Sequence, residues 1–390
     1  MFSRNSGPDR RALLATAFYI LALIGLCVHL YRTPVYDMDM IGYMGNALLT
    51  NGTSADKAHE LVYAEIRRLP ADARDSLLGL RSGDDPSHGA SRKARAAHAS
   101  YFAEFLPCFA IRPVYNQLLF LISRVSGLTR ATILLAVVPY FLLGVLVFYW
   151  ARRYASAGFA AIFSLLLMLM PPIASLGRTT ISDALSVFTA ALAVYLIFEK
   201  EQDAAGIGLL LLSIFVRTDN VILASLVFAA LWWMKKLKFW QTAVLGIFAA
   251  TCVVFINRMA GDYGLAMLYY RNFVDTPIAP AEMVVHFSKS DYLRAFREHL
   301  PSVLGGWVLA FLLLAVIGYQ RRSRLTILSA IGLAYIALHY ILLPNWWERW
   351  FVVAYIPMSL SACARVNLRP VAVRPIDAVA RPEIPIARIS

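Results

Sequence analysis

Charged residues are scarce in this sequence, and their scarcity excludes a soluble enzyme. Asp, Glu, Lys and Arg make up 16% of the 390 residues, whereas 59% are hydrophobic. Soluble domains carry about 25% charged residues. Strict alternation of apolar and polar residues is lacking too, because segments such as 133–147 and 209–215 are continuously apolar. Both features indicate membrane-spanning helices and exclude a barrel of strands.

Cysteine is also rare, and its placement excludes a disulfide framework or a cysteine metal site. Cys27, Cys252 and Cys363 lie in or near the end of apolar runs, which leaves Cys108 as the only thiol in a long polar loop. No small-residue cleavage site follows the first apolar run, so we expect that run to remain as an anchor rather than a cleaved signal peptide. An internal repeat is lacking as well, which disfavours an inverted-repeat transporter.

Basic residues are in excess, with a net charge of +13. They fall in short clusters between apolar runs, which is typical of the cytoplasmic loops of membrane proteins rather than of a nucleic-acid surface. We therefore expect no nucleic-acid partner, and we place these clusters on the cytoplasmic side of a bilayer. The clusters lie at residues 10–11, 152–153, 235–238, 321–324 and 365–369.

The apolar runs predict an all-α polytopic membrane protein with about ten transmembrane helices and both termini in the cytoplasm. Residues 114–122 are interpreted as a short re-entrant or interfacial helix, because an odd number of crossings between the first loop and residue 152 keeps that basic cluster inside. The expected spans are residues 12–30, 131–150, 157–170, 181–198, 206–216, 221–234, 239–256, 303–319, 325–343 and 350–363.

One transmembrane domain is expected over residues 1–365, with long outer loops at about 32–110 and 257–300. Within the first loop, apolar residues of 58–69 recur at helical spacing, which predicts a helix that lies in the membrane interface or packs as an ordinary loop helix. Residues 82–100 have little to bury and are expected to form a mobile tip. Residues 366–390 are rich in proline and predict an unfolded cytoplasmic tail.

Two acids stand directly after the first apolar run. Asp37 and Asp39 flank Met38 in the sequence YDMDMIGYMGNALL and would emerge at the far membrane face. Their spacing lets two carboxylates point at one site for metal binding or for general-base catalysis. The alternative is a pair of solvated loop acids, and the nearby Tyr43 and Asn46 favour a built site.

Three further charged motifs fall on the same face. Arg178 and Asp183 in GRTTISD lie at the mouth of the third span, as site residues or as an interfacial ion pair. Arg217 in FVRTDN lies at a break in a short span, where a charge costs about 2.5–3.5 kcal/mol and requires a partner or a cavity. Mutual neutralisation with Asp219 is the alternative for it.

The third motif is PNWWERWFVVAYIP, which places Glu348 and Arg349 among three tryptophans at a span boundary. The tryptophans alone form the expected aromatic belt of a membrane protein. An arginine on the outer face needs a separate explanation, and the planar guanidinium of Arg349 suits phosphate recognition.

Together these motifs resemble those of the GT-C superfamily of membrane glycosyltransferases. YDMDMIGYMGNALL resembles the first-loop acidic motif, with an acid four residues before a tyrosine. GRTTISDALSVF is similar to the second acidic motif of the oligosaccharyltransferase and dolichyl-phosphate mannosyltransferase branches. FVRTDNVIL, ERWFVVAYIP and RPVYNQLLFLISRVSG resemble the internal arginine break, the late arginine motif and the end of the first loop. The chain departs from many members in carrying Met40 after the loop acid where they have Glu.

The resemblance implies transfer of a sugar from a polyprenyl-phosphate donor to a lipid, glycan or protein acceptor, at the outer face of a bacterial-type inner membrane. It implies that Asp39 is the general base and that Asp37 assists it or binds a divalent cation, Mg²⁺ or Mn²⁺, together with Asp183. The implied substrate- and phosphate-binding residues are Arg349, Arg217, Arg178, Asp183, Glu348 and Tyr43.

Two other classes stay open from the sequence alone. A lipid or solute transporter or flippase would use the same outer arginines, but it should carry polar residues near mid-bilayer rather than at one face. A membrane acyltransferase or a ligase of cell-envelope glycans would want a catalytic histidine in a span. His339 is the deep histidine available, and core packing or a hydrogen bond is the simpler account of it.

Overall fold

The chain folds as helices, as the composition predicts. A computed structural model describes residues 10–81, 86–262, 268–269, 273–274, 288–320, 323–344 and 347–366, and these ranges hold no strand beyond one isolated bridge. The predicted tail lies outside the described residues except for Val366. Residues 321–322 of the fourth basic cluster and most of the predicted outer loop after residue 262 lie outside them too.

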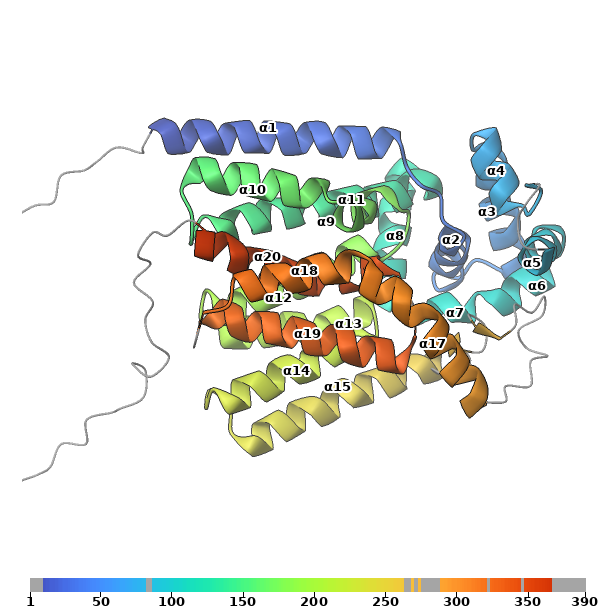
Figure 1. Ribbon diagram of the computed structural model, residues 1–390. Coiled ribbons are helices and arrows are strands. Elements are labelled where there is room, and N and C mark those ends of the chain that lie inside the picture. The colour runs from blue at the N-terminus through green and yellow to red at the C-terminus, as the bar shows by residue number, and fades with distance from the viewer. Residues whose placement is uncertain are drawn as a thin grey trace, which may run out of the picture.

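The larger part of the fold is a bundle whose long helices run side by side, with α1 and α15 at opposite edges (Figure 1). The bundle consists of α1 Arg10–Arg32, α9 Leu128–Ala151, α10 Ala157–Leu169, α11 Pro171–Arg178, α12 Asp183–Phe198, α13 Asp203–Val216, α14 Asn220–Trp233, α15 Phe239–Met259, α17 Lys289–Gly305, α18 Trp307–Ile317, α19 Arg324–Leu342, the 3₁₀ turn η2 Glu348–Phe351 and α20 Val352–Val366.

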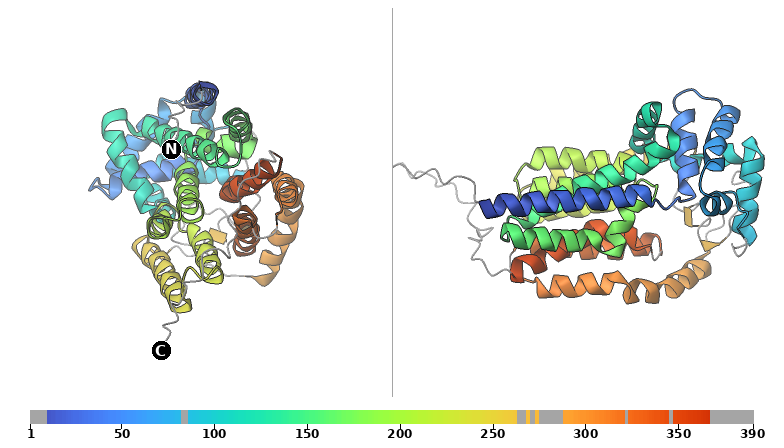
Figure 2. Two further views of the ribbon diagram at one scale, coloured as in Figure 1. Left: turned by 90° about the vertical axis from the view of Figure 1, so that its left-hand side faces the viewer. Right: turned by 90° about the horizontal axis from the view of Figure 1, so that it is seen from above.

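A smaller group of short helices covers one end of this bundle, and we call it the cap (Figures 1 and 2). It has its own apolar core, separate from that of the bundle. The cap consists of α2 Asp39–Leu49, α3 Ala55–Arg67, α4 Ala71–Leu77, α5 Pro86–Ala97, α6 Ala99–Phe105 and α7 Pro107–Ala110. It corresponds to the predicted long first loop, which is therefore a folded unit.

The structure bears out the ten predicted membrane spans only in part. Four helices, α1, α9, α15 and α19, are long and apolar enough to cross a bilayer, and counting each of three bent helix pairs as one span raises the number to seven among the described residues. Helices α12, α13 and α14 have 14 to 16 residues. At about 1.5 Å per residue they reach about 21–24 Å, short of a hydrocarbon core of about 30 Å.

Several bundle helices are short or bent. Helix α12 starts at Asp183, α13 ends at Val216 and α14 starts at Asn220. The predicted break at residues 217–220 is thus confirmed. Helix α10 is followed by α11 at an angle of 70°, and α17 meets α18 at 54°. Charged residues occupy the space that these interruptions leave.

Helix α8 (Pro113–Ser126) covers the segment interpreted as re-entrant or interfacial. It is bent by 117° from the preceding α6–α7 pair, and Figure 1 shows it crossing the end of the bundle rather than running along it. Gly127, with φ of 84°, then lets the chain turn directly into α9. The orientation of α8 agrees with a helix that does not span.

In the first loop, the structure decides between two open alternatives and changes one expectation. Helix α3 buries Ala58, Val62 and Ile66 against the cap, so its apolar face packs on protein as an ordinary loop helix rather than on lipid. Residues 86–97 of the expected mobile tip form α5, in which Arg95 is buried with its guanidinium 4.0 Å from the centre of the Phe105 ring. The contact with the aromatic face stabilises the buried guanidinium, and so this segment packs although it has few apolar residues.

The bundle core holds α1, α9 and α10 together by close packing and two tyrosine hydrogen bonds. Tyr19 donates to the carbonyl of Gly144 at 2.7 Å, and Tyr140 donates to that of Met168 at 2.5 Å. A Cβ on Gly144 would come within 2.8 Å of the Leu23 methyl groups, so a larger residue there would force the Leu23 side chain to move.

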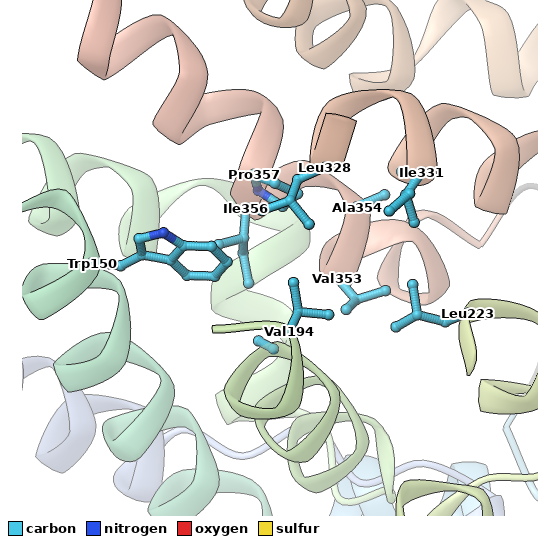
Figure 3. A pocket seen from close by; sticks show the side chains of 11 residues that line it. Trp150, Val194, Leu223, Leu328, Ile331, Val353, Ala354, Ile356 and Pro357 are labelled. Carbon is cyan, nitrogen blue, oxygen red and sulfur yellow. The ribbon is translucent and has the colours of Figure 1, made fainter. Parts of the chain in front are cut away.

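Figure 3 shows a small cavity in the same core, at the meeting of α9, α12, α14, α19 and α20. Its volume is about 20 Å³, and apolar side chains such as Trp150, Val194 and Leu223 line it. A space of this size holds about one water molecule, which needs polar partners that an apolar wall does not offer. We therefore regard it as a packing void.

Labelling from one side of the membrane tests the predicted topology. We expect an impermeant thiol reagent applied outside intact cells to modify a Lys93→Cys variant in the cap, and to modify a Lys236→Cys variant, after α14, only in permeabilised cells. Both lysines are exposed, whereas the four native cysteines are buried and should give little background. Reaction of both variants from the same side would show that the predicted parity of crossings is wrong.

Candidate functional site

A cavity of about 350 Å³ lies where the cap meets the bundle. Its lining has two parts, a charged end and an apolar side. The charged and polar residues are Asp39, Arg112, Asp183, Arg217, Thr218, Asp219, Asn257, His339 and Arg349. The apolar side includes Val221 and Ile222 of α14, Val253 of α15, Leu342 of α19 and Trp347. A cavity of this size suits a small polar group joined to an apolar chain.

The charged end is built on Arg217, which is buried at the break between α13 and α14. Its Nε and Nη2 donate to the two oxygens of Asp219 at 2.9 and 2.8 Å, and its Nη1 pairs with Asp183. The ring of Trp350 lies 5.6 Å away. Because two carboxylates share this guanidinium, neutralisation explains how the chain buries it, as the alternative reading of FVRTDN proposed.

Arg349 connects the same acids to the first loop. Its Nε lies 3.1 Å from Oδ2 of Asp183, and its Nη1 donates to Oδ2 of Asp37 at 3.5 Å. Nε of Arg349 and Oδ2 of Asp183 form an ion pair, but they are not aligned for a hydrogen bond. The Trp347 ring lies 4.9 Å from the guanidinium and supports it. Residues separated by 312 positions in sequence thus meet.

The acids of the site stand at the starts of helices. Asp39 is the first residue of α2, Asp183 is the first residue of α12, and Asp219 is the N-cap residue of α14. The unpaired N–H groups and the dipole at a helix start favour a negative charge. Asp37 precedes α2 and accepts a hydrogen bond from the backbone N–H of Asp39 at 3.0 Å. These local interactions hold several carboxylates close together.

A short clamp aligns the two acidic segments. Val35 donates to the carbonyl of Arg178 at 2.8 Å, and the N–H of Thr180 donates back to Val35 at 3.2 Å. The Thr180 hydroxyl, which is fully buried, accepts from the N–H of Asp37 at 3.2 Å. Arg178 itself is exposed, and its Nε donates to the carbonyl of Thr33 at 2.7 Å. Arg178 therefore fixes the loop from outside the cavity rather than lining it.

The clamp predicts a stability effect at Thr180. We expect Thr180→Val to lower the free energy of unfolding by about 0.5–1.5 kcal/mol, because the partly buried N–H of Asp37 loses its acceptor. Thr180→Ser keeps the hydroxyl and should remain close to wild type. Thermal unfolding of the purified protein in detergent measures the difference. Equal melting temperatures for the Val and Ser variants would show that the hydroxyl does not stabilise the clamp.

Tyr43 and Asn46 serve packing rather than the cavity. The Tyr43 hydroxyl lies 3.3 Å from that of Ser182, and its ring packs edge-on against Phe109. Burial raises the pKa of Tyr43 to about 12, so the hydroxyl stays protonated. Asn46 donates to the carbonyl of Leu106 at 2.5 Å and joins α2 to the segment before α7. Both residues fix the position of α2.

Glu348 also has a structural position. It accepts a hydrogen bond from the backbone N–H of Trp307 at 2.6 Å and so satisfies the first turn of α18. Burial raises the pKa of its carboxyl above the ordinary value. Glu348 does not line the cavity.

Arg112 lines the charged end but was not among the residues that the sequence suggested. It lies between α7 and α8, with its guanidinium 5.1 Å from the centre of the Tyr43 ring and within electrostatic reach of Asp39 and Asp219. Within the described residues its side chain makes no ion pair. The motif RPVYNQ was noted for its place in the chain, and only the fold shows that its first residue faces the acids.

His339 reaches the site from α19. Its Nε2 lies 3.2 Å from Oδ2 of Asp219, and the Trp350 ring centre is 5.0 Å from that of the imidazole. The hydrogen bond and the packing together agree with the simpler account of this residue. His339 extends the line of paired side chains that runs through Asp219 and Arg217 to Asp183.

The divalent cation suggested by the resemblance does not fit the pair of Asp37 and Asp183. Both carboxylates face the guanidinium of Arg349, at 3.5 and 3.1 Å. Within the described ranges, no three His, Cys, Asp or Glu residues are grouped as a metal site.

The structure brings together most of the residues that the sequence pointed to. Asp37, Asp39, Asp183, Arg217 and Arg349 meet at the charged end. The side chains of Arg178, Tyr43 and Glu348 lie outside the cavity lining. The sequence matches no protein-family model and no curated protein, and the fold matches no solved structure.

Proposed function

We propose that this protein is a membrane glycosyltransferase that moves a sugar from a polyprenyl-phosphate donor to an acceptor. The observation that carries the proposal is the cavity at the cap, in which arginines and carboxylates at one end continue into an apolar side. A lipid-linked sugar needs cations for its phosphate and an apolar surface for its tail. A nucleotide-sugar enzyme has no use for the second of these.

The apolar side offers a path for the tail. Helix α14 packs against both α15 and α19, and each of the three contributes side chains to the cavity wall. Val221, Val253 and Leu342 belong to this wall. We infer that the first isoprene units of the donor lie over α14, between α15 and α19.

The charged end offers the groups for transfer. In the proposed reaction Asp39 removes the proton of the acceptor hydroxyl, whose oxygen bonds to the anomeric carbon while the bond from that carbon to the phosphate oxygen breaks. The lipid phosphate leaves with the bonding electrons. Arg349 and Arg112 stabilise the negative charge on it. Arg349 uses Nε and Nη1 for Asp183 and Asp37, and its other terminal nitrogen has no partner within the described residues.

The proposed location is a bacterial-type inner membrane with the cap on the periplasmic side. Arg10 and Arg11 begin α1 at the end of the bundle opposite the cap, and residues 152–153 and 235–238 follow the ends of α9 and α14 there (Figure 1). Such basic clusters mark cytoplasmic loops. The acceptor would then be a lipid, glycan or protein of the cell envelope.

Donor binding and turnover test the proposal. Purified protein should bind a polyprenyl-phosphate sugar and release polyprenyl phosphate, with water as a slow acceptor where no better one is present. Arg349→Lys should weaken donor binding by about 10- to 100-fold, because a charge-assisted hydrogen bond of about 1.5–3 kcal/mol is lost with the planar fork. Arg258→Lys, at an exposed arginine of α15, is the matched control.

The result has clear alternatives. Donor affinity that stays the same in Arg349→Lys and in Arg349→Ala would remove Arg349 from the phosphate site. Transbilayer movement of the intact lipid without release of polyprenyl phosphate would favour a flippase over a transferase.

A further inference from the structure

We propose that the guanidinium of Arg349 occupies the position a divalent cation would take between Asp37 and Asp183. The site then holds its two loop acids together with an organic cation. This inference concerns the folded protein itself, and its principal test measures metal binding, so it stands or falls separately from the proposed transferase activity.

All four oxygens of the two carboxylates are already engaged. Asp37 accepts from the backbone N–H of Asp39 through Oδ1 and from Arg349 through Oδ2. Asp183 pairs with Arg217 through Oδ1 and with Arg349 through Oδ2. A metal ion that bridges the two acids would have to displace a guanidinium at Asp183, and a guanidinium or a backbone N–H at Asp37. Each oxygen of the two carboxylates therefore already has a cationic or N–H partner.

Arg349 is held firmly enough to keep a metal out. Its side chain is 20% exposed, that of Asp183 is 4% exposed, and the Trp347 ring lies beside the guanidinium. Mg²⁺ binds carboxylate oxygens at about 2.0–2.1 Å and requires near-octahedral geometry with several waters. An acid buried to this degree, with a cation against each oxygen, leaves little room for that hydration shell.

The charge balance explains why a cation is needed there. The charged end carries the aspartates 37, 39, 183 and 219 against the arginines 112, 217 and 349. Without Arg349, Asp37 and Asp183 would face each other with only Arg217 against one of them. Two carboxylates that contact the same guanidinium lie close enough to repel each other, and burial strengthens the repulsion. A variant without the guanidinium should therefore recruit a metal ion.

Mn²⁺ binding to the purified full-length protein tests the proposal. Electron paramagnetic resonance counts bound Mn²⁺, and the melting temperature with and without Mn²⁺ reports binding to the folded state. We expect no Mn²⁺ bound at this site in wild type, and a bound ion together with a raised melting temperature in Arg349→Met. Arg349→Lys is the matched control and should bind none, because an ammonium still lies near the acids. The double variant Arg349→Met/Asp183→Asn should lose the ion.

Each outcome decides the question. Mn²⁺ that binds wild type and is lost in Asp37→Asn or Asp183→Asn overturns the proposal, since a metal then coexists with Arg349. Absence of binding in a folded Arg349→Met variant also overturns it, because the two acids then do not form a cation position. If Arg349→Met does not fold, the comparison of wild type with Asp183→Asn still tests the proposal. Mn²⁺ that binds wild type but not Asp183→Asn overturns it, and absence of Mn²⁺ from wild type supports it. For the proposed transferase activity, we expect wild-type turnover to persist in the presence of a metal chelator.

Discussion

If Asp39 is the proposed general base, replacing it by Asn should lower turnover by about 10²–10⁴-fold, the usual contribution of such a base, while donor affinity and protein yield stay close to wild type. The amide has the same shape as the carboxylate but cannot take the proton. Asp39 lines the cavity, whereas Asp37 is paired with Arg349 and caps the backbone of α2. Release of polyprenyl phosphate from a purified donor measures the effect.

Asp37→Asn is the matched comparison. Asn keeps an oxygen for the backbone N–H of Asp39 but loses the charge opposite Arg349, so a smaller loss of turnover is expected. A dead Asp37→Asn beside an active Asp39→Asn would exchange the two roles. If both variants turn over normally, the charged end of the cavity is not the catalytic centre.

Removing Arg217 should produce the largest loss of stability. We expect Arg217→Met to lower the free energy of unfolding by about 3–5 kcal/mol, because it leaves the buried Asp183 and the partly buried Asp219 without their shared cation. The Arg217 and Asp183 side chains are 8% and 4% exposed. Thermal unfolding in detergent, monitored through the loss of helical signal, measures the change.

Two comparisons make that result specific. Lys236→Met removes an exposed ion pair with Asp203, so it should cost at most about 1 kcal/mol. Arg217→Met/Asp219→Asn removes one of the stranded charges and should recover part of the loss. A single Arg217→Met variant as stable as Lys236→Met would mean that water reaches the two acids and solvates them.

The sequence by itself determined the class of fold and several local features. Long apolar runs and few charges specify helices in a membrane, because backbone groups in lipid must bond within their own helix. The same reasoning located the break at Arg217, since a charge at that depth requires a partner. The acids at residues 37 and 39 could be singled out because they follow an apolar run directly. Each of these inferences depends on neighbouring residues only.

Only the tertiary structure decided which charges meet. Arg349 reaches Asp37 across 312 positions, and no local pattern encodes that contact. Arg178 and Arg349 look alike as outer arginines, yet one faces outward at the end of α11 and the other lies between two acids. Arg112 had no local signal beyond its place in the chain.

The helix bounds also depend on the fold, because hydropathy records how long an apolar run is, but not where its helix begins and ends. Helix α12 starts at Asp183, α13 ends at Val216 and α14 starts at Asn220, and these helix ends lie at the charged end of the cavity. Apolar content is a property of each segment, whereas a buried ion network is stable only when several segments supply opposite charges together, and that cooperation exists only in the folded molecule.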